Sequence, residues 1–188
     1  MPTTDPAASP DSTLDVVVLL DEDATPIGTA PRATVHDTDT PLHLAFSCHL
    51  LDEHGRLLVT RRALSKKTWP GVWTNSFCGH PRPGETFEQA VRRHADHELG
   101  LDVEDVAPVL PDFRYRAVDA AGVVENEVCP VFTARPGGSR RRPTPNPDEV
   151  AELVWVEVAD VLAVIERAPW ALSPWLVAQV DALRLLAN

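Results

Sequence analysis

The segment of residues 73–85 brings the most reactive side chains of the chain close together. Cys78 and His80 stand two residues apart, so their side chains point to the same side of an extended chain. A cysteine alone is more often a small buried residue than a catalyst, but a neighbouring imidazole and polar residues favour a reactive thiol. Glycines and prolines nearby indicate a shaped loop, which would carry a candidate acid or base.

Two carboxylates and two further histidines could complete a metal site. Glu125 and Glu127 share one face of a predicted strand. Like charges on one face are unfavourable unless a cation or a proton relieves them; the alternative is an acidic strand face in water. With His36, His43 and His80 they make a set that suits Zn, Mn or Fe. Spacing alone does not show that the five side chains converge.

A third pattern follows the reactive loop. Glu85, Arg93 and Glu98 have the spacing of the Nudix box, a loop–helix–loop that binds Mg²⁺ on a diphosphate. The match is incomplete because His94 and His97 stand where the box has glutamates. A hydrolase needs several carboxylates to hold Mg²⁺ and to activate water. The pattern therefore indicates diphosphate binding without the full hydrolytic set.

Composition limits the functions that these residues can serve. The chain has 188 residues, 44% of them hydrophobic, which is ordinary for one globular domain. Its formal net charge of −11 argues against nucleic-acid binding, and no apolar run is long enough to span a membrane. Both lysines, Lys66 and Lys67, follow Arg61 and Arg62. This basic cluster could bind a small anion or form a solvated turn.

The N-terminal segment and the cysteines suggest where the protein works. Residues 1–13 are polar and lack an apolar core, which predicts a flexible tail rather than a secretory signal, followed by a single domain over residues 14–188. The cysteines are odd in number and far apart, which argues against disulfides or a CxxC zinc site. We expect a cytoplasmic protein that is a monomer or a weak dimer.

Capping residues locate the helices that position these side chains. Thr86 and Gln89 form a capping box at the start of a helix, and Gly100 suits the left-handed position after its end. Ser173 and Pro174 begin the last helix as N-cap and first helical residue. A further helix is predicted at residues 158–167.

Apolar runs and turns locate the strands. They are predicted at residues 14–20, 42–51, 56–62, 113–118, 123–134 and 153–156. The turns at residues 52–55 and 119–122 each join two of them, and residues 136–147, rich in Pro, Gly and Arg, predict an exposed loop. Hairpins mixed with helices predict a layered α/β or α+β domain with a mixed sheet.

Taken in order, these segments resemble the type I isopentenyl-diphosphate isomerases, a branch of the Nudix superfamily. The matching stretches are residues 36–46, 61–67, 69–76, 78–81, 113–116, 125–130 and 173–175. The resemblance implies a Nudix-like mixed β-sheet sandwiched between helices. It also implies an enzyme of isoprenoid biosynthesis that converts isopentenyl diphosphate to dimethylallyl diphosphate. Protonation of one carbon and deprotonation of another would pass through a tertiary carbocation.

The resemblance implies a role for each candidate catalytic residue. Cys78 and Glu127 would be the acid/base pair on opposite faces of the substrate. Tyr115 would assist proton delivery on the Glu127 side, and Trp175 would place its ring face near the carbocation. Because water quenches a carbocation, the site should close over the substrate. Cys48 and Cys129 are expected to be packing residues.

Two metal ions and a set of basic residues are implied in the same way. One divalent metal (Mn, Zn or Mg) would bind His36, His43, His80, Glu125 and Glu127. A separate Mg²⁺ would lie between Glu98, a backbone carbonyl near Cys78 and the diphosphate. The residues that would hold the diphosphate itself are Arg32, Arg62 and Lys66.

Two other functions stay open at this point. A Nudix hydrolase acting on a nucleoside or prenyl diphosphate would release phosphate and would tolerate loss of Cys78. A non-catalytic binding module stabilised by a metal would need its histidines for folding but not its thiol. His94 and His97 argue against the hydrolase, because they replace carboxylates that hydrolysis requires.

Overall fold

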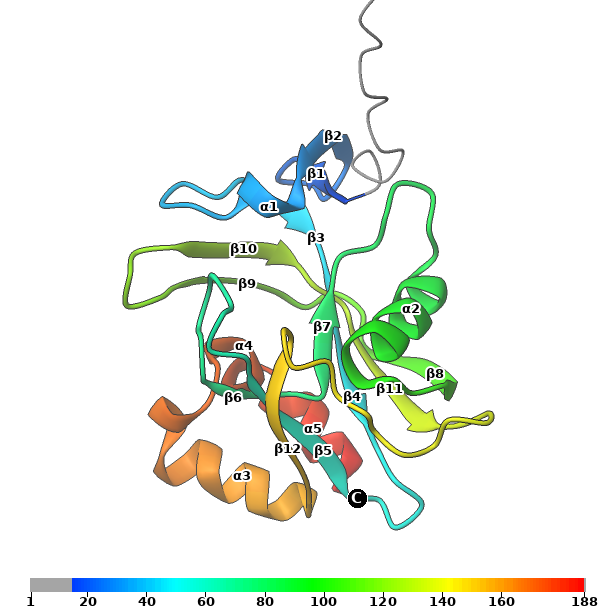
Figure 1. Cartoon of the computed structure of the whole chain (residues 1–188). Helices are drawn as coiled ribbons and strands as arrows, with labels where there is room; N and C mark the ends of the chain where they lie inside the picture. Colours follow the sequence, from blue (N-terminus) through cyan, green and yellow to red (C-terminus); the bar gives the residue numbers. More distant parts are fainter. Residues whose placement is uncertain (1–14, 188) are drawn as a thin grey trace, which may run out of the picture.

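The computed structural model describes residues 15–187, which form three β-sheets with helices packed beside them (Figure 1). The predicted class, an α/β or α+β domain with mixed β-sheet, is confirmed. Two of the three sheets combine parallel and antiparallel strand pairs. The tail predicted at residues 1–13 lies outside the described residues. No helix within residues 15–187 combines the length and the apolar character needed to cross a membrane.

The first sheet has the strand order β2-β1-β3-β10-β9. Its β3 and β10 run parallel, and its other pairs are antiparallel. The hairpin predicted around the turn at residues 119–122 is confirmed, since Asp119 N–H donates to the Val123 carbonyl at 2.9 Å. The strands are β1 Val16–Leu20, β2 Pro26–Pro31, β3 His43–Leu44, β9 Arg114–Val118 and β10 Val124–Val128.

The other two sheets lie below the first in Figure 1. The second has the order β7-β4-β11-β8, with β4 and β11 parallel, and the third has the antiparallel order β12-β5-β6. Strands of the second are β4 Phe46–Leu50, β7 Phe77–Gly79, β8 Val103–Leu110 and β11 Val131–Pro136. Strands of the third are β5 Leu57–Arg62, β6 Trp73–Thr74 and β12 Val150–Val156.

Two predicted strands each divide between the first and second sheets. Residues 42–51 form β3 and β4, which separate at Ala45, and residues 123–134 form β10 and β11, which separate at Cys129 and Pro130. Proline has no N–H to donate, so Pro130 interrupts its ladder, although its carbonyl still accepts from Ser47 N–H at 3.1 Å. The two breaks lie side by side, which brings the ends of the sheets together.

The two strands joined by the turn at residues 52–55 also separate. The turn forms, with Asp52 N–H donating to the Arg56 carbonyl at 2.9 Å. Beyond the bridge between Leu51 and Leu57, however, β4 pairs with β7 and β11, whereas β5 pairs with β6 and β12. The turn thus carries the chain from the second sheet into the third.

Helix α2, Phe87–Leu99, begins and ends where the sequence predicts. Thr86 and Gln89 exchange capping hydrogen bonds, and Gly100 adopts a left-handed φ of 60°. The prediction of α3, Val158–Arg167, is confirmed as well. The last helix begins at Pro174 behind the Ser173 cap, but it divides at Gln179. Its two parts are α4 Pro174–Ala178 and α5 Val180–Leu186.

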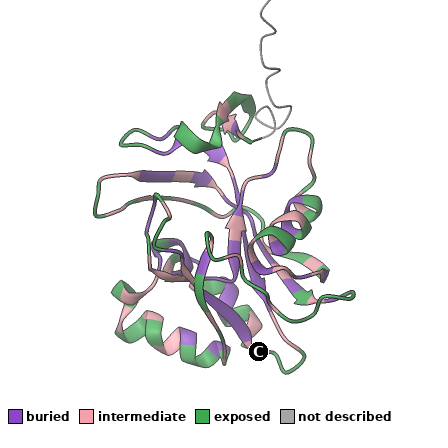
Figure 2. Cartoon of the chain, in the orientation of Figure 1, coloured by how far each residue is buried: buried purple, intermediate pink, exposed green. Residues whose placement is uncertain are grey.

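Two apolar cores hold the layers together. One lies between α2 and the second sheet, and the other lies between the third sheet and helices α3 and α5. Figure 2 shows the buried strands in the middle of the molecule and exposed residues along the outer faces of the helices. The sequence did not predict β2, β8 or the short helix α1, Arg32–Val35. The shaped loop expected within residues 73–85 was wrong in part, because β6 and β7 form there by pairing with the distant strands β5 and β4.

Candidate active site and metal centre

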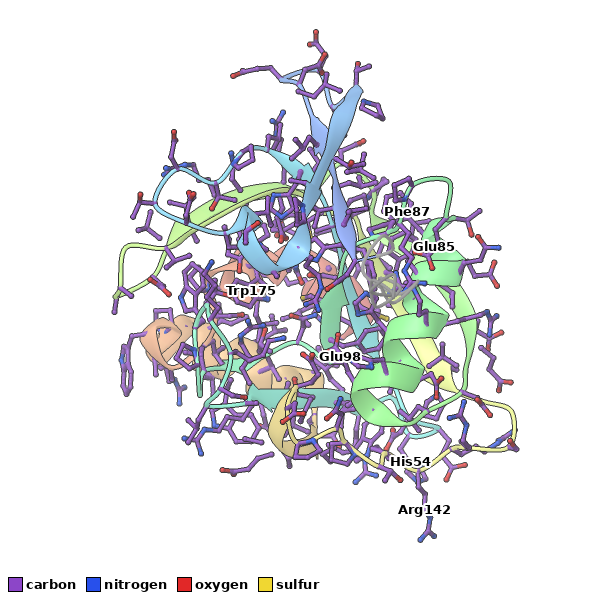
Figure 3. The ribbon with its side chains drawn as sticks, turned by 45° about the horizontal axis from the view of Figure 1, so that its top comes forward. His54, Glu85, Phe87, Glu98, Arg142 and Trp175 are labelled. Carbon is purple, nitrogen blue, oxygen red and sulfur yellow. The ribbon has the colours of Figure 1, made fainter. Side chains whose placement is uncertain are left out.

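A cleft of about 460 Å³ opens where the sheets meet α2 and α4. It collects candidate residues that are far apart in the sequence. In Figure 3, Trp175 and Glu98 lie toward the middle of the molecule, whereas His54 and Arg142 lie at its rim. The predicted site residues that line it are Arg32, His36, Arg62, Lys66, Cys78, His80, Glu98, Tyr115, Glu125, Glu127 and Trp175. His43 is fully buried beside it.

Four of the five predicted ligands of the first metal converge. The ligand atoms of His36, His43, His80 and Glu127 all lie within 4.8 Å of one another. The distances from Glu127 Oε1 to Nε2 of His43 and of His80 are 3.5 and 3.3 Å. The register places Glu127 directly beside His43 in the parallel pair of β10 and β3. This pairing is long-range, so it depends on the fold.

The convergent residues fit a divalent metal. His43 Nδ1–H donates to the Pro41 carbonyl at 2.9 Å, which leaves the Nε2 lone pair facing Glu127. The buried Nε2 atoms of His36 and His43 make no hydrogen bond of acceptable geometry to any residue in the described part of the chain. Imidazole nitrogens with a carboxylate are a typical donor set for Zn or Mn.

Glu125, the fifth predicted ligand, lies next to this group but is not part of it. Its Oε2 is 3.0 Å from Nε2 of His36, and its Oε1 accepts a hydrogen bond from Thr68 Oγ1 at 2.7 Å. Glu125 is buried, with 6% of its surface exposed. One of its oxygens therefore has a protein partner, while the other faces a histidine of the group.

Burial and neighbouring charges set the ionisation of the group. Burial alone would raise the pKa of Glu127, but His43 and His80 together hold it well below its usual range. Burial acts against the charged form of His43, yet Glu127 raises the pKa of this imidazole overall. Burial lowers the pKa of His80 and outweighs the opposing effect of Glu127. Glu127 is therefore an ionised carboxylate, which can bind a cation or accept a proton.

Cys78 lies in β7 and reaches the same cleft as Glu127. Its thiol donates to Asn75 Oδ1 at 3.3 Å, and its Sγ lies 3.2 Å from Ser47 Oγ. Burial raises the pKa of the thiol to about 12, although the hydrogen bonds to Ser47 and Asn75 oppose this shift. Cys78 is therefore protonated, and the cleft contains both a proton donor and a proton acceptor.

Two aromatic rings form part of the wall of the same cleft. Tyr115 pairs with Glu127 across β9 and β10, and its ring centroid is 5.8 Å from that of Trp175. Burial and Glu127 raise the pKa of Tyr115, so its hydroxyl keeps its proton. The Cζ atom of Arg62 lies 5.5 Å from the Trp175 centroid, so a cation already lies over this ring.

The predicted diphosphate-binding residues line the cleft, but each has a partner. Arg32 Nε donates to Asp15 at 2.6 Å, and Lys66 donates to Glu149. Arg62 Nη2 donates to the carbonyl of Thr68 at 2.9 Å. Asp15 and Glu149 were not predicted, because their pairing is visible only in the fold. A diphosphate would have to displace or share these partners.

The Nudix-box positions have mostly structural contacts. Arg93 donates to both oxygens of Glu85, at 2.8 and 2.7 Å, and to the His80 carbonyl at 3.0 Å. Glu98 Oε1 lies 2.9 Å from His94 Nδ1, and Glu98 lines the cleft. A Cβ atom at position 79 would lie 2.4 Å from the His94 ring, so Gly79 lets this imidazole approach. Only Glu98 of the box carboxylates thus faces the cleft.

Sequence comparisons agree with the geometry. The NUDIX domain family model matches residues 41–176. The isopentenyl-diphosphate Delta-isomerase of Agromyces mediolanus is 59% identical over 179 residues, covering 95% of this chain and 85% of that protein. The protein of the same name from Leifsonia xyli subsp. xyli is 60% identical over 169 residues, covering 89% and 90%.

Solved structures share the fold at lower identity. DR0079 from Deinococcus radiodurans superposes with a TM-score of 0.66 at 22% identity, covering 88% of this chain and 97% of that one. A MutT NUDIX hydrolase from Burkholderia pseudomallei gives a TM-score of 0.55 at 22% identity, covering 75% and 97%. The solved structures show the fold alone. The match to the NUDIX domain model and the identities to the curated relatives establish that the chain belongs to the isopentenyl-diphosphate Delta-isomerase family of NUDIX domain proteins.

Proposed function

We propose that this protein converts isopentenyl diphosphate to dimethylallyl diphosphate. The observation that supports this most directly is the pairing of a protonated thiol, Cys78, with an ionised carboxylate, Glu127, in one cleft. Moving a double bond along three carbons needs one proton given and one proton taken. The relatives with about 59% identity carry the name of this activity.

Cys78 and Glu127 are the two proton-transfer groups in this proposal. One protonates the terminal alkene carbon and the other removes a proton from the carbon on the far side of the cation. Their roles exchange when the reaction runs backwards. The faces of Trp175 and Tyr115 attract the positive charge that develops between these steps. Trp175 is buried and Tyr115 is half-buried, and the two rings together would keep out water, which would trap the cation as an alcohol.

The chain's charged residues fit a diphosphate and two divalent ions. His36, His43, His80 and Glu127, with Glu125 alongside, would hold one ion of Mn, Zn or Mg. When bound, this ion would lower the proton affinity of Glu127 and fix its orientation. Glu98 would hold a Mg²⁺, which would offset the negative charge of the diphosphate. Arg32, Arg62 and Lys66 would bind the diphosphate oxygens.

The remaining expectations belong to the same proposal. A small diphosphate would be the only partner that the reaction requires, without nucleic acid or a membrane. We propose a single catalytic domain over residues 14–188 that works in the cytoplasm as a monomer or a weak dimer. The formal net charge of −11 supports the absence of a nucleic-acid partner.

Incubation with isopentenyl diphosphate in heavy water tests the proposal. The purified, metal-supplemented protein should produce dimethylallyl diphosphate with deuterium in a methyl group, detected by NMR and mass spectrometry. Release of phosphate or pyrophosphate instead would support a Nudix hydrolase. Unchanged substrate, under conditions where a related isomerase is active, would contradict the proposal.

A further inference from the structure

Asn75 lies behind the cleft, between the candidate proton donor and the aromatic wall. It has no exposed surface and is not among the described residues that line the cleft. Its side-chain oxygen accepts hydrogen bonds from Cys78 Sγ at 3.3 Å and from Trp175 Nε1 at 2.9 Å. One buried amide therefore contacts two groups that the proposed reaction uses.

The surrounding backbone settles which way the amide points. Asn75 Nδ2 donates to the carbonyls of Cys48 at 3.1 Å and Phe77 at 2.8 Å. Because a carbonyl only accepts, the nitrogen must face these two groups and Oδ1 must face the donors. The thiol of Cys78 must then be the donor to Oδ1. The direction of this bond follows from the contacts around it.

A third donor connects Asn75 with the start of α4. Thr74 Oγ1 donates to Asn75 Oδ1 at 2.9 Å and lies 2.8 Å from the hydroxyl of Ser173, the N-cap of α4. Ser173 N–H also donates to the Trp73 carbonyl at 2.8 Å. The helix that carries Trp175 is thus anchored to the segment that carries Asn75.

We infer that Asn75 is a positioning residue, which holds the Cys78 thiol and the Trp175 ring in a fixed relation to each other. The inference deepens the proposed isomerase function and rests on it. Asn75 and Trp175 are 100 positions apart in the chain, so local structure cannot set their separation. A shift of a reacting group by about 1 Å can cost about a hundredfold in rate.

Ser47 holds the thiol from another side but does not reach the ring. Its hydroxyl accepts from Gln179 Nε2 at 2.8 Å and lies 3.2 Å from Cys78 Sγ. Both Ser47 and Gln179 are fully buried. The thiol therefore has two side-chain partners, of which Asn75 alone, among the described residues, also bonds to Trp175.

Replacement of Asn75 by leucine removes the bonds while nearly keeping the volume. We expect Asn75→Leu to lower kcat by about 10- to 100-fold, because the thiol and ring lose their common anchor. KM should change less than about threefold, because Asn75 does not line the cleft that would hold the diphosphate. A kcat equal to wild type would overturn the inference.

Ser76→Ala is the matched control for buried hydrogen bonding. Ser76 is also fully buried, and its hydroxyl donates to the Leu58 carbonyl at 2.6 Å and accepts from Leu50 N–H at 2.7 Å. Among the described residues, its hydroxyl has no hydrogen bond to Cys78 or Trp175. Ser76→Ala should lower Tm while leaving kcat unchanged. If it lowers kcat as much as Asn75→Leu does, the effect of Asn75 is general destabilisation and the inference is wrong.

The indole N–H of Trp175 allows its hydrogen bond to Asn75 to be tested by NMR, without an activity assay. In a ¹⁵N–¹H spectrum, a buried hydrogen-bonded indole should resonate downfield and exchange slowly, unlike Trp170, which is 85% exposed. Trp175→Phe assigns the signal, and Asn75→Leu should move it upfield. If the wild-type signal exchanges as fast as that of Trp170, the inference fails even when no Asn75 variant folds.

A double-variant cycle tests whether Asn75 and Trp175 act through the same hydrogen bond. The fold-reduction in kcat of the double variant Asn75→Leu/Trp175→Phe should be smaller than the product of the fold-reductions of the two single variants, because both substitutions remove the same bond. If the two fold-reductions in kcat multiply, the residues do not share a role and the inference is contradicted. Asn75→Ala replaces Asn75→Leu if leucine prevents folding. An inactive wild type would refute the proposed isomerase, whereas the indole signal would still test the contact.

Discussion

Cys78 and Glu127 reach the cleft in opposite protonation states, and their surroundings explain the difference. Burial raises the pKa of Cys78 to about 12, and the carboxylates of Glu127 and Glu98 act in the same direction. Glu127 is also buried, but His43 and His80 stabilise its charge and lower its pKa. A pair that begins as acid and base can transfer two protons across one substrate.

Replacement of Cys78 should abolish the proposed isomerisation without unfolding the protein. We expect Cys78→Ala to lower kcat by more than about a hundredfold, since a proton-transfer group is lost. The control is Cys48→Ala, which changes a fully buried cysteine in β4 that is not among the described residues lining the cleft. Circular dichroism and a steady-state assay should show both variants folded and only Cys48→Ala active. Activity of Cys78→Ala above a few per cent of wild type would exclude its assigned role.

Trp175 should contribute through its ring face more than through its indole N–H. Trp175→Phe keeps a smaller π face but loses the bond to Asn75, so a moderate loss of kcat is expected. Trp175→Ala should lose about 30-fold more, because a desolvated cation–π contact contributes about 2 kcal/mol. Steady-state kinetics of both variants make the comparison. If alanine were tolerated better than phenylalanine, the ring would have no role in stabilising a cation.

At the scale of elements, the loop between β7 and α2 holds His80 in place. Glu85 accepts two hydrogen bonds from Arg93 and one from Arg82 N–H at 2.8 Å, while Arg93 also donates to the His80 carbonyl. These contacts connect the start of α2 to its middle and to the loop that carries His80. The Glu85 position of the Nudix box is therefore occupied by a structural ion pair.

The Glu85–Arg93 pair should make stability depend on pH. Burial acts to raise the pKa of Glu85, but Arg93 lowers it overall. The carboxylate thus contributes its full stabilisation at pH values above about 4.3, the pKa of a glutamate in the unfolded chain. This contribution is lost as the pH falls through the lower pKa that Glu85 has in the folded protein. Glu85→Gln should cost about 2 kcal/mol at pH 7, and urea unfolding should show the difference narrowing below about pH 4.

Glu88→Gln is the control for this prediction. Glu88 pairs with Arg92 one turn along the same helix, but its side chain is 60% exposed. An exposed pair with this spacing contributes only about 0.5 kcal/mol, so the variant should unfold nearly like wild type at either pH. If Glu85→Gln and Glu88→Gln lower the free energy of unfolding equally, the Glu85–Arg93 pair does not stabilise the loop that carries His80.

At the scale of the whole molecule, the candidate metal centre joins four segments of the chain. His36 follows α1, His43 belongs to the first sheet, and His80 follows β7 of the second sheet. Glu127 comes from β10, close to the point where the chain crosses between these sheets. A divalent ion at this group would link the N-terminal strands to the α2 side of the protein.

Metal loading should therefore raise the melting temperature. An ion present at a thousand times its Kd adds about 4 kcal/mol. For a chain of 188 residues, this corresponds to a rise in Tm of about 8–16 °C. Calorimetry before and after chelation, with added Zn²⁺ or Mn²⁺, measures the shift.

Two histidine variants test whether the rise in Tm comes from metal bound at this group. His43→Ala removes a ligand in the core of the group and should abolish most of the rise, with loss of bound metal after dialysis. His54→Ala changes an exposed histidine in the turn at residues 52–55, and this variant should keep the full rise in Tm. A full Tm shift in His43→Ala would place the stabilising ion elsewhere.

Much of the local structure could be predicted from short-range patterns. The capping box at Thr86, the left-handed Gly100 and the Ser173–Pro174 start each depend on residues within a few positions. The hairpin of β9 and β10 follows from its turn. Strand divisions at Ala45 and Pro130 were missed, because apolar residues continue through both breaks and only pairing with distant strands separates the sheets.

The sequence by itself predicted the reactive residues and identified the family, since residue types and their order carry both. Only the tertiary structure decided which residues meet: His36, His43, His80 and Glu127 converge, while Glu125 stands beside them. It also revealed the buried hydrogen bonds of Asn75 to Cys78 and Trp175. The physical reason is that these contacts join segments tens of residues apart. Strand register and burial set their distances, and no local pattern records either.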